Sequence, residues 1–173
     1  YGLVNRVGFL FVMIVMGFNQ GMQPIAGYNF GARLYPRVTE VTKLTMLYAT
    51  GVTTLGFLLC EIIPSSIIRM FTTNTELINT AVYGLRITFA VFPIVGFQMV
   101  ATNFFTSIGM AKKAIFLSMS RQLLFLLPCL LILPSFYGVT GVWLSSPISD
   151  LVATVITSLV LIYQFRQFKT QDK

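Results

Sequence analysis

The sequence predicts an all-α, polytopic membrane protein with about five transmembrane helices. Hydrophobic residues make up 55% of the 173 residues and charged residues only 10%, and the mean hydropathy is +0.80. Soluble globular domains contain about a quarter charged residues. Apolar stretches of roughly 20 residues, the length that crosses a bilayer as a helix, recur with only short connections between them. We therefore expect residues 1–173 to form a single membrane domain.

The first two spans are expected at residues 3–29 and 38–63. Arg33 and Arg37 mark a short polar turn between them. Pro36 suits the first turn of the second helix, where its missing N–H group would have had no partner.

The third span is expected at residues 76–108 and would be the longest. Thr73 and Glu76 fit a capping box that opens this helix. Pro93 predicts a kink near its middle.

The fourth and fifth spans are expected at residues 111–133 and 139–168. The turn between them contains Pro134 and Gly138. Trp143 lies near the start of the fifth span, where amphipathic rings prefer the membrane interface.

The basic residues predict the orientation of the chain. Nine of the twelve Lys and Arg follow the first and third spans or the last one: Arg33, Arg37, Lys43, Lys112, Lys113, Arg121, Arg166, Lys169 and Lys173. The positive-inside rule then places the C-terminus in the cytoplasm. Five spans put the N-terminus outside, so we expect at least one helix before Tyr1.

Composition argues against several other classes of protein. No histidine occurs, so the commonest general base and metal ligand is missing. Cys60 and Cys129 lack metal-ligand spacing. The net charge of +7 lies at helix ends rather than on one solvated face, which argues against a nucleic-acid partner. The sequence predicts neither an enzyme nor a resident cofactor or metal.

Polar side chains gather at the end of the first span. Gln20 and Gln23 lie one helical turn apart and are expected to share a face with Asn19, and Asn29 follows. Pro24 removes one backbone donor and frees a carbonyl in the same turn. These five residues are candidates for lining a cavity. Simple packing of helices with hydrogen-bonded amides is the alternative, and the two Gly-x-x-x-Gly spacings of this segment (Gly17 and Gly21, Gly27 and Gly31) agree with it.

A second polar seam is expected on the later part of the third span. Gln98 and Thr102 are four residues apart, and Asn103 adds an amide. With neighbouring aromatic rings and Met99 they could contact lipophilic cations, although phenylalanine in a membrane most often faces lipid.

Asp150 is the most suggestive ionisable residue, because it is followed by an apolar run. A carboxylate inside a membrane is costly and implies a partner or a function. Asp150 is a candidate proton or cation site, with nearby serine hydroxyls. The alternative is a structural cap or an ion pair, for example with Arg86. Arg121 is expected to extend to lipid phosphate, and Glu61 is expected to pair with Arg69.

Residues 20–32, QGMQPIAGYNFGA, resemble a motif of the multidrug and toxic compound extrusion (MATE) family, QG-x-QPI-x-GYN-x-GA, on the second helix of its C-terminal lobe. Two further segments agree in order: the Pro-Ile-x-Gly-Phe segment of residues 93–97, and the pattern G-x-x-G-V-W-x-x-x-P-I-x-D at residues 138–150. The resemblance covers essentially the whole chain.

The resemblance implies a twelve-helix transporter with two six-helix lobes around a central cavity. Such proteins export cationic, often aromatic, compounds in exchange for protons or sodium. The chain would supply the eighth to twelfth helices in the cytoplasmic membrane, with membrane lipid, organic cations, the N-terminal lobe and the first helix of this lobe as partners. The family's coupling carboxylates commonly lie on the first helix of a lobe.

Two other functions remain open at this stage. One is a flippase of related two-lobed fold for lipid-linked oligosaccharides, which usually needs cationic residues facing pyrophosphate. The other is a fragment that does not transport and has an assembly role.

Overall fold

The computed structural model describes residues 1–171, and all of its regular elements in that range are helices. They are α1 (Gly2–Gly31), α2 (Tyr35–Ile62), α3 (Pro64–Arg69), α4 (Thr75–Phe89), α5 (Phe92–Ser107), α6 (Ala111–Met119), the π-helix η1 (Ser120–Leu126), α7 (Leu127–Tyr137) and α8 (Val139–Gln171). Lys173, one of the residues used to predict the orientation, lies outside the described residues.

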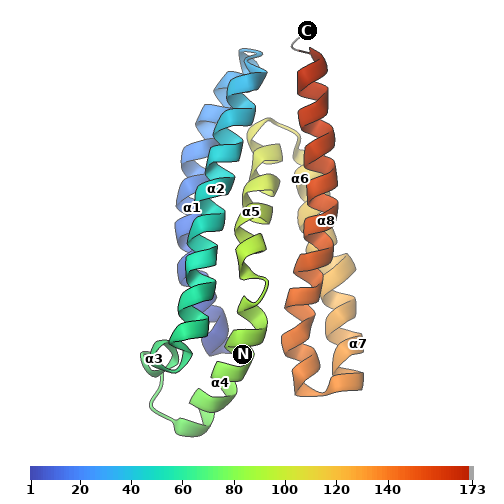
Figure 1. Cartoon of the computed structure of the whole chain (residues 1–173). Coiled ribbons are helices and arrows are strands. Elements are labelled where there is room, and N and C mark those ends of the chain that lie inside the picture. The colour runs from blue at the N-terminus through green and yellow to red at the C-terminus, as the bar shows by residue number, and fades with distance from the viewer. Residues whose placement is uncertain (172–173) are drawn as a thin grey trace.

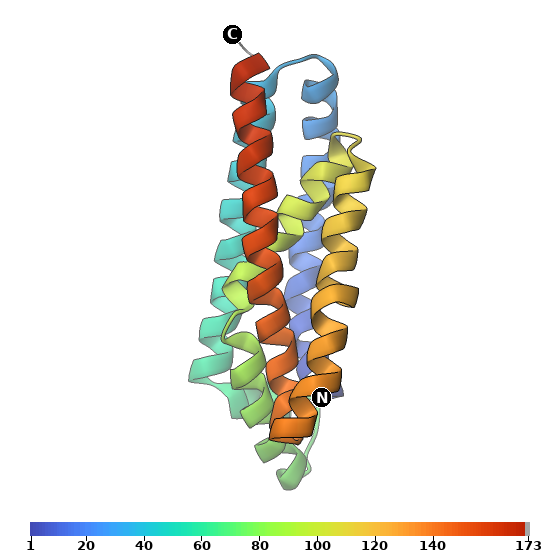
Figure 2. The same cartoon turned by 90° about the vertical axis from the view of Figure 1, so that its right-hand side faces the viewer.

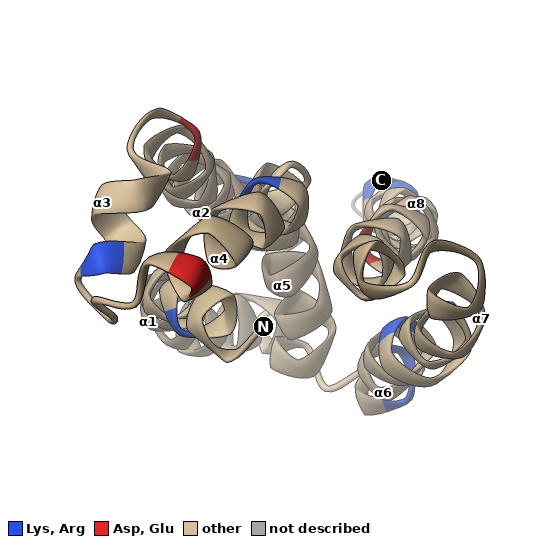
Figure 3. Ribbon diagram, turned by 90° about the horizontal axis from the view of Figure 1, so that it is seen from below, with Lys and Arg blue, Asp and Glu red and all other residues tan. Residues whose placement is uncertain are grey.

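The helices form an elongated bundle in which α5 is central (Figure 1). Helices α1 and α2 pair on one side of α5, and α6, η1, α7 and α8 group on the other (Figure 3). Helix α8 runs the length of the bundle (Figure 2). The central position of α5 brings side chains from both groups onto its surface.

Four helical segments of the described residues are long and apolar enough to cross a bilayer: α1, α2, α8 and the continuous run from Ala111 to Tyr137. Counting the bent pair of α4 and α5 as one span gives five, which agrees with the predicted number. The second span begins earlier than expected, at Tyr35, with Pro36 in its first turn. This chain is therefore a multi-pass membrane protein.

The third span is broken rather than merely kinked. Helices α4 and α5 meet at an angle of 53°, and Pro93 lies in the first turn of α5. The hydroxyl group of Thr53 in α2 donates to the Pro93 carbonyl oxygen at 3.1 Å. The expectation that this would be the longest helix was wrong, because the break divides it.

The N-cap of α4 is Asn74 rather than the expected Thr73. The Asn74 side chain accepts hydrogen bonds from the Glu76 and Leu77 N–H groups.

The fourth span is longer than predicted. The helix continues through Pro134 and ends at Gly138, whose φ of +58° is accessible mainly to glycine. The membrane environment explains why the helix is longer than predicted. If the helix ended inside the hydrocarbon region, the backbone after it would expose unpaired N–H and C=O groups to lipid. The π-helix of residues 120–126 inside this span had no expected counterpart.

Two apolar clusters hold the bundle together. One surrounds Phe104 and Phe105 near the C-terminal end, and the other surrounds Phe89 and Trp143 near the opposite end. Phe104 and Phe105 are fully buried, so the expectation that such rings face lipid was wrong for both.

The contact between α2 and α5 gives a test of the packing. A Cβ atom at Gly96 would lie 2.6 Å from the Thr53 hydroxyl oxygen and 2.7 Å from the Ala49 carbonyl oxygen, whereas one at Gly51 would meet nothing within 4 Å. Overpacking of this kind costs about 1–3 kcal/mol. We predict that Gly96→Ala lowers the thermal midpoint in detergent and Gly51→Ala does not. Equal midpoints for the two variants would contradict the close approach.

Candidate functional site

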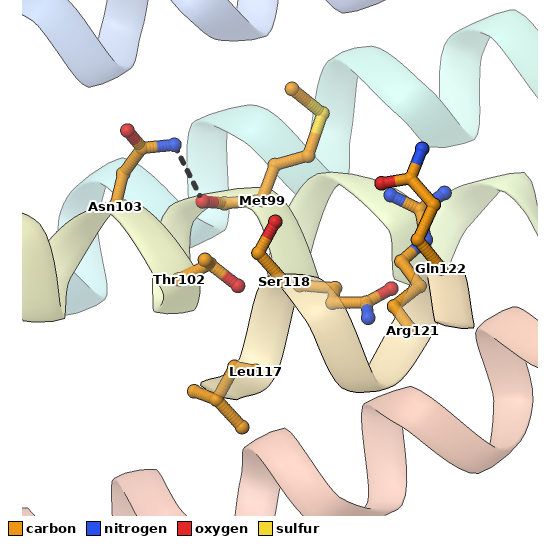
Figure 4. A pocket seen from close by; sticks show the side chains of 8 residues that line it. Met99, Thr102, Asn103, Leu117, Ser118, Arg121 and Gln122 are labelled. Atoms are coloured by element: carbon orange, nitrogen blue, oxygen red, sulfur yellow. Dashed lines mark hydrogen bonds between the residues drawn. The ribbon is translucent and has the colours of Figure 1, made fainter. Parts of the chain in front are cut away.

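A polar cavity of about 150 Å³ lies between α5 and the α6–η1 segment. Figure 4 shows the side chains that line it, which come from these two elements. The lining residues are Gln98, Met99, Thr102, Asn103, Leu117, Ser118, Arg121 and Gln122. Three of the residues predicted from the second polar seam, Gln98, Thr102 and Asn103, therefore lie together.

The cavity is linked to α1 by an amide pair. The Gln23 Nε2 atom donates to the Asn103 Oδ1 atom at 3.2 Å, and the Asn103 Nδ2 atom donates to the Met99 carbonyl oxygen at 2.9 Å (Figure 4). Both polar atoms of the Asn103 side chain thus have hydrogen-bond partners. The bond between Gln23 and Asn103 joins α1 to α5 across 80 residues of the chain. This pair connects the first and third spans, the two places where the sequence concentrates amides.

Gln98 brings hydrogen-bonding capacity that the protein leaves free. Its side chain is buried, and its Oε1 atom has no hydrogen-bond partner among the described residues. Buried polar atoms without a protein partner cost about 1–3 kcal/mol unless water or a ligand satisfies them. Gln98 is therefore a polar residue of the cavity wall whose side-chain acceptor no described residue uses.

A larger cavity of about 470 Å³ adjoins the first and shares two of its residues, Arg121 and Gln122. Its walls come from α1, α4, α5, η1 and α8, and its lining is Val4, Asn5, Gly8, Phe9, Val12, Thr88, Phe89, Phe92, Val95, Arg121, Gln122, Ser146 and Asp150. The Phe89 and Phe92 rings stack with their centroids 4.2 Å apart. The larger cavity thus combines aromatic surface with a carboxylate.

Arg121 and Asp150 form a short ion pair at the edge of both cavities. The Arg121 Nε atom lies 2.7 Å from the Asp150 Oδ1 atom, and the Asp150 side chain is only 10% exposed. In addition, the Ser149 hydroxyl group donates to the Arg121 carbonyl oxygen at 3.1 Å. These contacts attach η1 to α8 through both the side chain and the backbone of Arg121.

The π-helix gives Arg121 this position. A π-helix holds each N–H to the carbonyl five residues back, so it turns side chains to other faces than an α-helix would and is frequent at functional sites. Arg121 is the second residue of η1. The sequence alone placed Arg121 at the lipid interface and suggested Arg86 as the partner of Asp150. Both expectations were wrong, because Arg121 itself pairs with Asp150. Arg86 instead pairs with Glu61 at 3.6 Å. This contact also replaces the expected pair of Glu61 with Arg69.

Four other predicted residues of the first span do not reach the cavities. Asn19 is buried without a hydrogen-bond partner among the described residues, and Asn29 donates to the Ile25 carbonyl oxygen of its own helix at 2.8 Å. Gln20 and Pro24 are exposed on the side of α1, so Gln20 does not share the buried face of Asn19. Of the first motif, only Gln23 joins the polar contacts of α5.

The glycine spacings of α1 allow less close packing than expected. A Cβ atom at Gly17, Gly21 or Gly31 would meet nothing within 4 Å. At Gly27 it would lie 3.0 Å from the Ser107 carbonyl oxygen of α5. Of these four glycines, only Gly27 lies close to a neighbouring backbone.

Asp150 was predicted from the sequence as a candidate site, but its partner Arg121 and several other lining residues were not. Arg121 and Asp150 lie well inside their spans, and pairing opposite charges at similar depth could have suggested their contact. Gln122 also offered a signal, as a polar residue within an apolar run. Phe9, Phe89 and Phe92 gave none, because aromatic residues are common throughout this chain.

The fold and these cavities define a polytopic helical membrane protein with a polar interior of the kind found in transporters. The MatE family model matches residues 1–131, and the chain therefore belongs to the MATE family. Among curated relatives, the multidrug export protein MepA of Staphylococcus haemolyticus is 23% identical over 173 residues, and MepA of Staphylococcus aureus is 26% identical over 176. The chain spans about 38% of the length of each relative.

Solved structures give the same assignment. The MATE multidrug transporter DinF-BH, solved in complex with R6G, is 40% identical, with a TM-score of 0.86 over 96% of this chain and 37% of that one. A MATE protein in complex with MaL6 is 16% identical and has a TM-score of 0.91 over 98% of this chain and 39% of that one, which shows the shared fold. The chain thus has the fold of part of a MATE transporter.

The ion pair predicts an asymmetric response to mutation. Replacing Arg121 by Gln leaves a carboxylate that is only 10% exposed without its partner, whereas replacing Asp150 by Asn leaves a guanidinium group that is 38% exposed. Breaking a buried pair costs roughly 3 kcal/mol, and less when water reaches the remaining charge. We predict that Arg121→Gln lowers the thermal midpoint more than Asp150→Asn.

The double variant Arg121→Gln/Asp150→Asn serves as the control. It removes both charges, so its thermal midpoint should exceed that of Arg121→Gln alone. Additive losses in the double variant would show that the two residues are not coupled.

Proposed function

We propose that this chain contributes the polar cavities of a secondary active antiporter, which exports cationic or aromatic organic compounds in exchange for protons or sodium. In this proposal the protein acts in multidrug efflux at the cytoplasmic (inner) membrane, with its C-terminus inside and a second lobe completing the transport path. Family membership and the multidrug transporters among the relatives support the class. The observation that carries the proposal is the Arg121–Asp150 pair at the edge of two cavities.

The larger cavity has the chemistry that suits an organic cation. Aromatic faces attract cations through their quadrupole, and a few convergent polar groups fix the orientation of a ligand. Phe89 and Phe92 line the larger cavity with aromatic surface, while the Asp150 carboxylate offsets the positive charge of Arg121 that would repel a cation. In the smaller cavity Gln98 and Asn103 add amide groups. Gln23 acts indirectly, because it holds Asn103.

Asp150 is proposed as the coupling residue because its carboxylate already forms an ion pair with Arg121. A proton or a sodium ion at the carboxylate competes with the guanidinium group for the same oxygen atoms. Loss of the pair frees Arg121 to carry an uncompensated positive charge into both cavities, where it repels a cationic substrate. When Asp150 is paired again, that repulsion ends and a new substrate can bind. Ion uptake and substrate release are thereby linked.

A flippase for lipid-linked oligosaccharides is the second candidate. Arg121 lines both cavities, and a cation in that position is what a pyrophosphate group requires. The short contact with Asp150 weighs against this function, because the guanidinium group is already engaged by a carboxylate. We therefore rank export of organic cations first.

We predict that Asp150→Asn in the full-length protein reduces ion-driven export of ethidium, an aromatic cation, by about an order of magnitude, which corresponds to 1.4 kcal/mol. The reason is that the neutral amide no longer exchanges a charge between ion and arginine. Reconstituted vesicles with an imposed proton or sodium gradient provide the measurement. Unchanged ion-dependent export would remove the coupling role of Asp150.

Glu61→Gln is the matched control, because it makes the same chemical change at a carboxylate outside both cavities. Its export should equal that of the unmodified protein. Binding of a lipid-linked oligosaccharide together with no export of any organic cation would favour the flippase instead.

A further inference from the structure

A second, separate groove opens on the outer surface of the bundle between α6 and α8. It has a volume of about 510 Å³ and is lined by Lys112, Lys113, Phe116, Leu159, Val160 and Tyr163. The apolar part of this lining is exposed, with Phe116 and Leu159 56% and 63% accessible. None of these residues lines the two polar cavities. The groove is thus independent of the proposed transport path.

Lys113 is held in place at the rim of this groove. Its Nζ atom donates to the Gln164 Oε1 atom at 2.7 Å, and Gln164 is buried with 2% exposure. The same ammonium group lies 5.7 Å from the centroid of the Phe105 ring. An ammonium group has three donors, so two N–H groups remain for another partner. The side chain is therefore a fixed cation rather than a freely moving one.

The charge of this rim has no counter-ion in the described part of the chain. The ion pairs there join Arg86 with Glu61 and Arg121 with Asp150, and no acidic residue lines the groove. Lys112 is exposed beside Lys113. Two lysines that line one groove without a carboxylate in its lining favour an anion there.

We propose that this groove binds an anionic phospholipid, with the headgroup phosphate at Lys112 and Lys113 and an acyl chain along Phe116, Leu159 and Val160. The apolar lining selects a lipid over a free anion, because a small anion leaves that surface uncovered. Both lysines are in the first turn of α6 (Ala111–Met119), which begins in the half of the bundle that also holds the C-terminus and the turn between α1 and α2 (Figure 1). The positive-inside rule assigns that end to the cytoplasmic leaflet, whose surface potential is negative.

Native mass spectrometry of the full-length protein tests the proposal, with phosphatidylglycerol and phosphatidylcholine of equal chain length as probes. A lysine near the membrane surface strengthens the attraction of anionic lipid. We predict that the protein retains phosphatidylglycerol in preference to phosphatidylcholine. The variant Lys112→Gln/Lys113→Gln should weaken that retention by about tenfold or more. Lys113→Arg keeps the charge and should retain the lipid even if the double variant folds poorly.

The matched control is Lys43→Gln/Lys169→Gln, which removes two exposed lysines that do not line the groove. It should leave the preference for phosphatidylglycerol unchanged. Equal loss in both double variants would reduce the effect to net charge and overturn the proposal. Retention of both lipids to the same extent, or displacement of phosphatidylglycerol by millimolar inorganic phosphate, would overturn it as well. None of these outcomes depends on transport, so the lipid site and the proposed function can fail separately.

Discussion

The polar interior of this bundle depends on the ion pair between Arg121 and Asp150. An isolated charge within a bilayer is costly, and the cost falls when an opposite charge and hydrogen bonds accompany it. Here the pair joins η1 to α8, and the Ser149 hydroxyl group secures the backbone at the same point. Because Arg121 lines both cavities, any change in the pair alters the charge of both at once.

Helix α5 supplies the opposite wall, and its break from α4 explains how. One face of α5 packs tightly on α2 around Gly96, while Gln98, Thr102 and Asn103 face the smaller cavity. A straight third span would keep one direction throughout the membrane. The bend of 53° instead lets Phe89 and Phe92 border the larger cavity from either side of the break. Apolar packing and polar lining are thereby divided between faces of one short helix.

Much of the fold follows from the sequence, because crossing hydrocarbon requires long apolar helices and short connections. Amides at Gln23, Gln98 and Asn103 stood out for the same reason, and the structure brings Gln23 and Asn103 into contact. The partner of Asp150 did not follow, since pairing between distant helices depends on their relative rotation. The π-helix changes that rotation locally. Whether the amides and Asp150 act in transport remains a prediction.

Water access to the smaller cavity tests the central claim most directly. In the full-length protein without its native cysteines, single cysteines would replace Thr102, which lines the cavity, and Leu131, which is 69% exposed on the outer surface of α7. A charged, membrane-impermeant thiol reagent should label the cysteine at position 102, and an organic cation should protect it. The cysteine at position 131 should stay unlabelled in hydrocarbon. An unreactive position 102 under every ion gradient would contradict a polar cavity that serves transport.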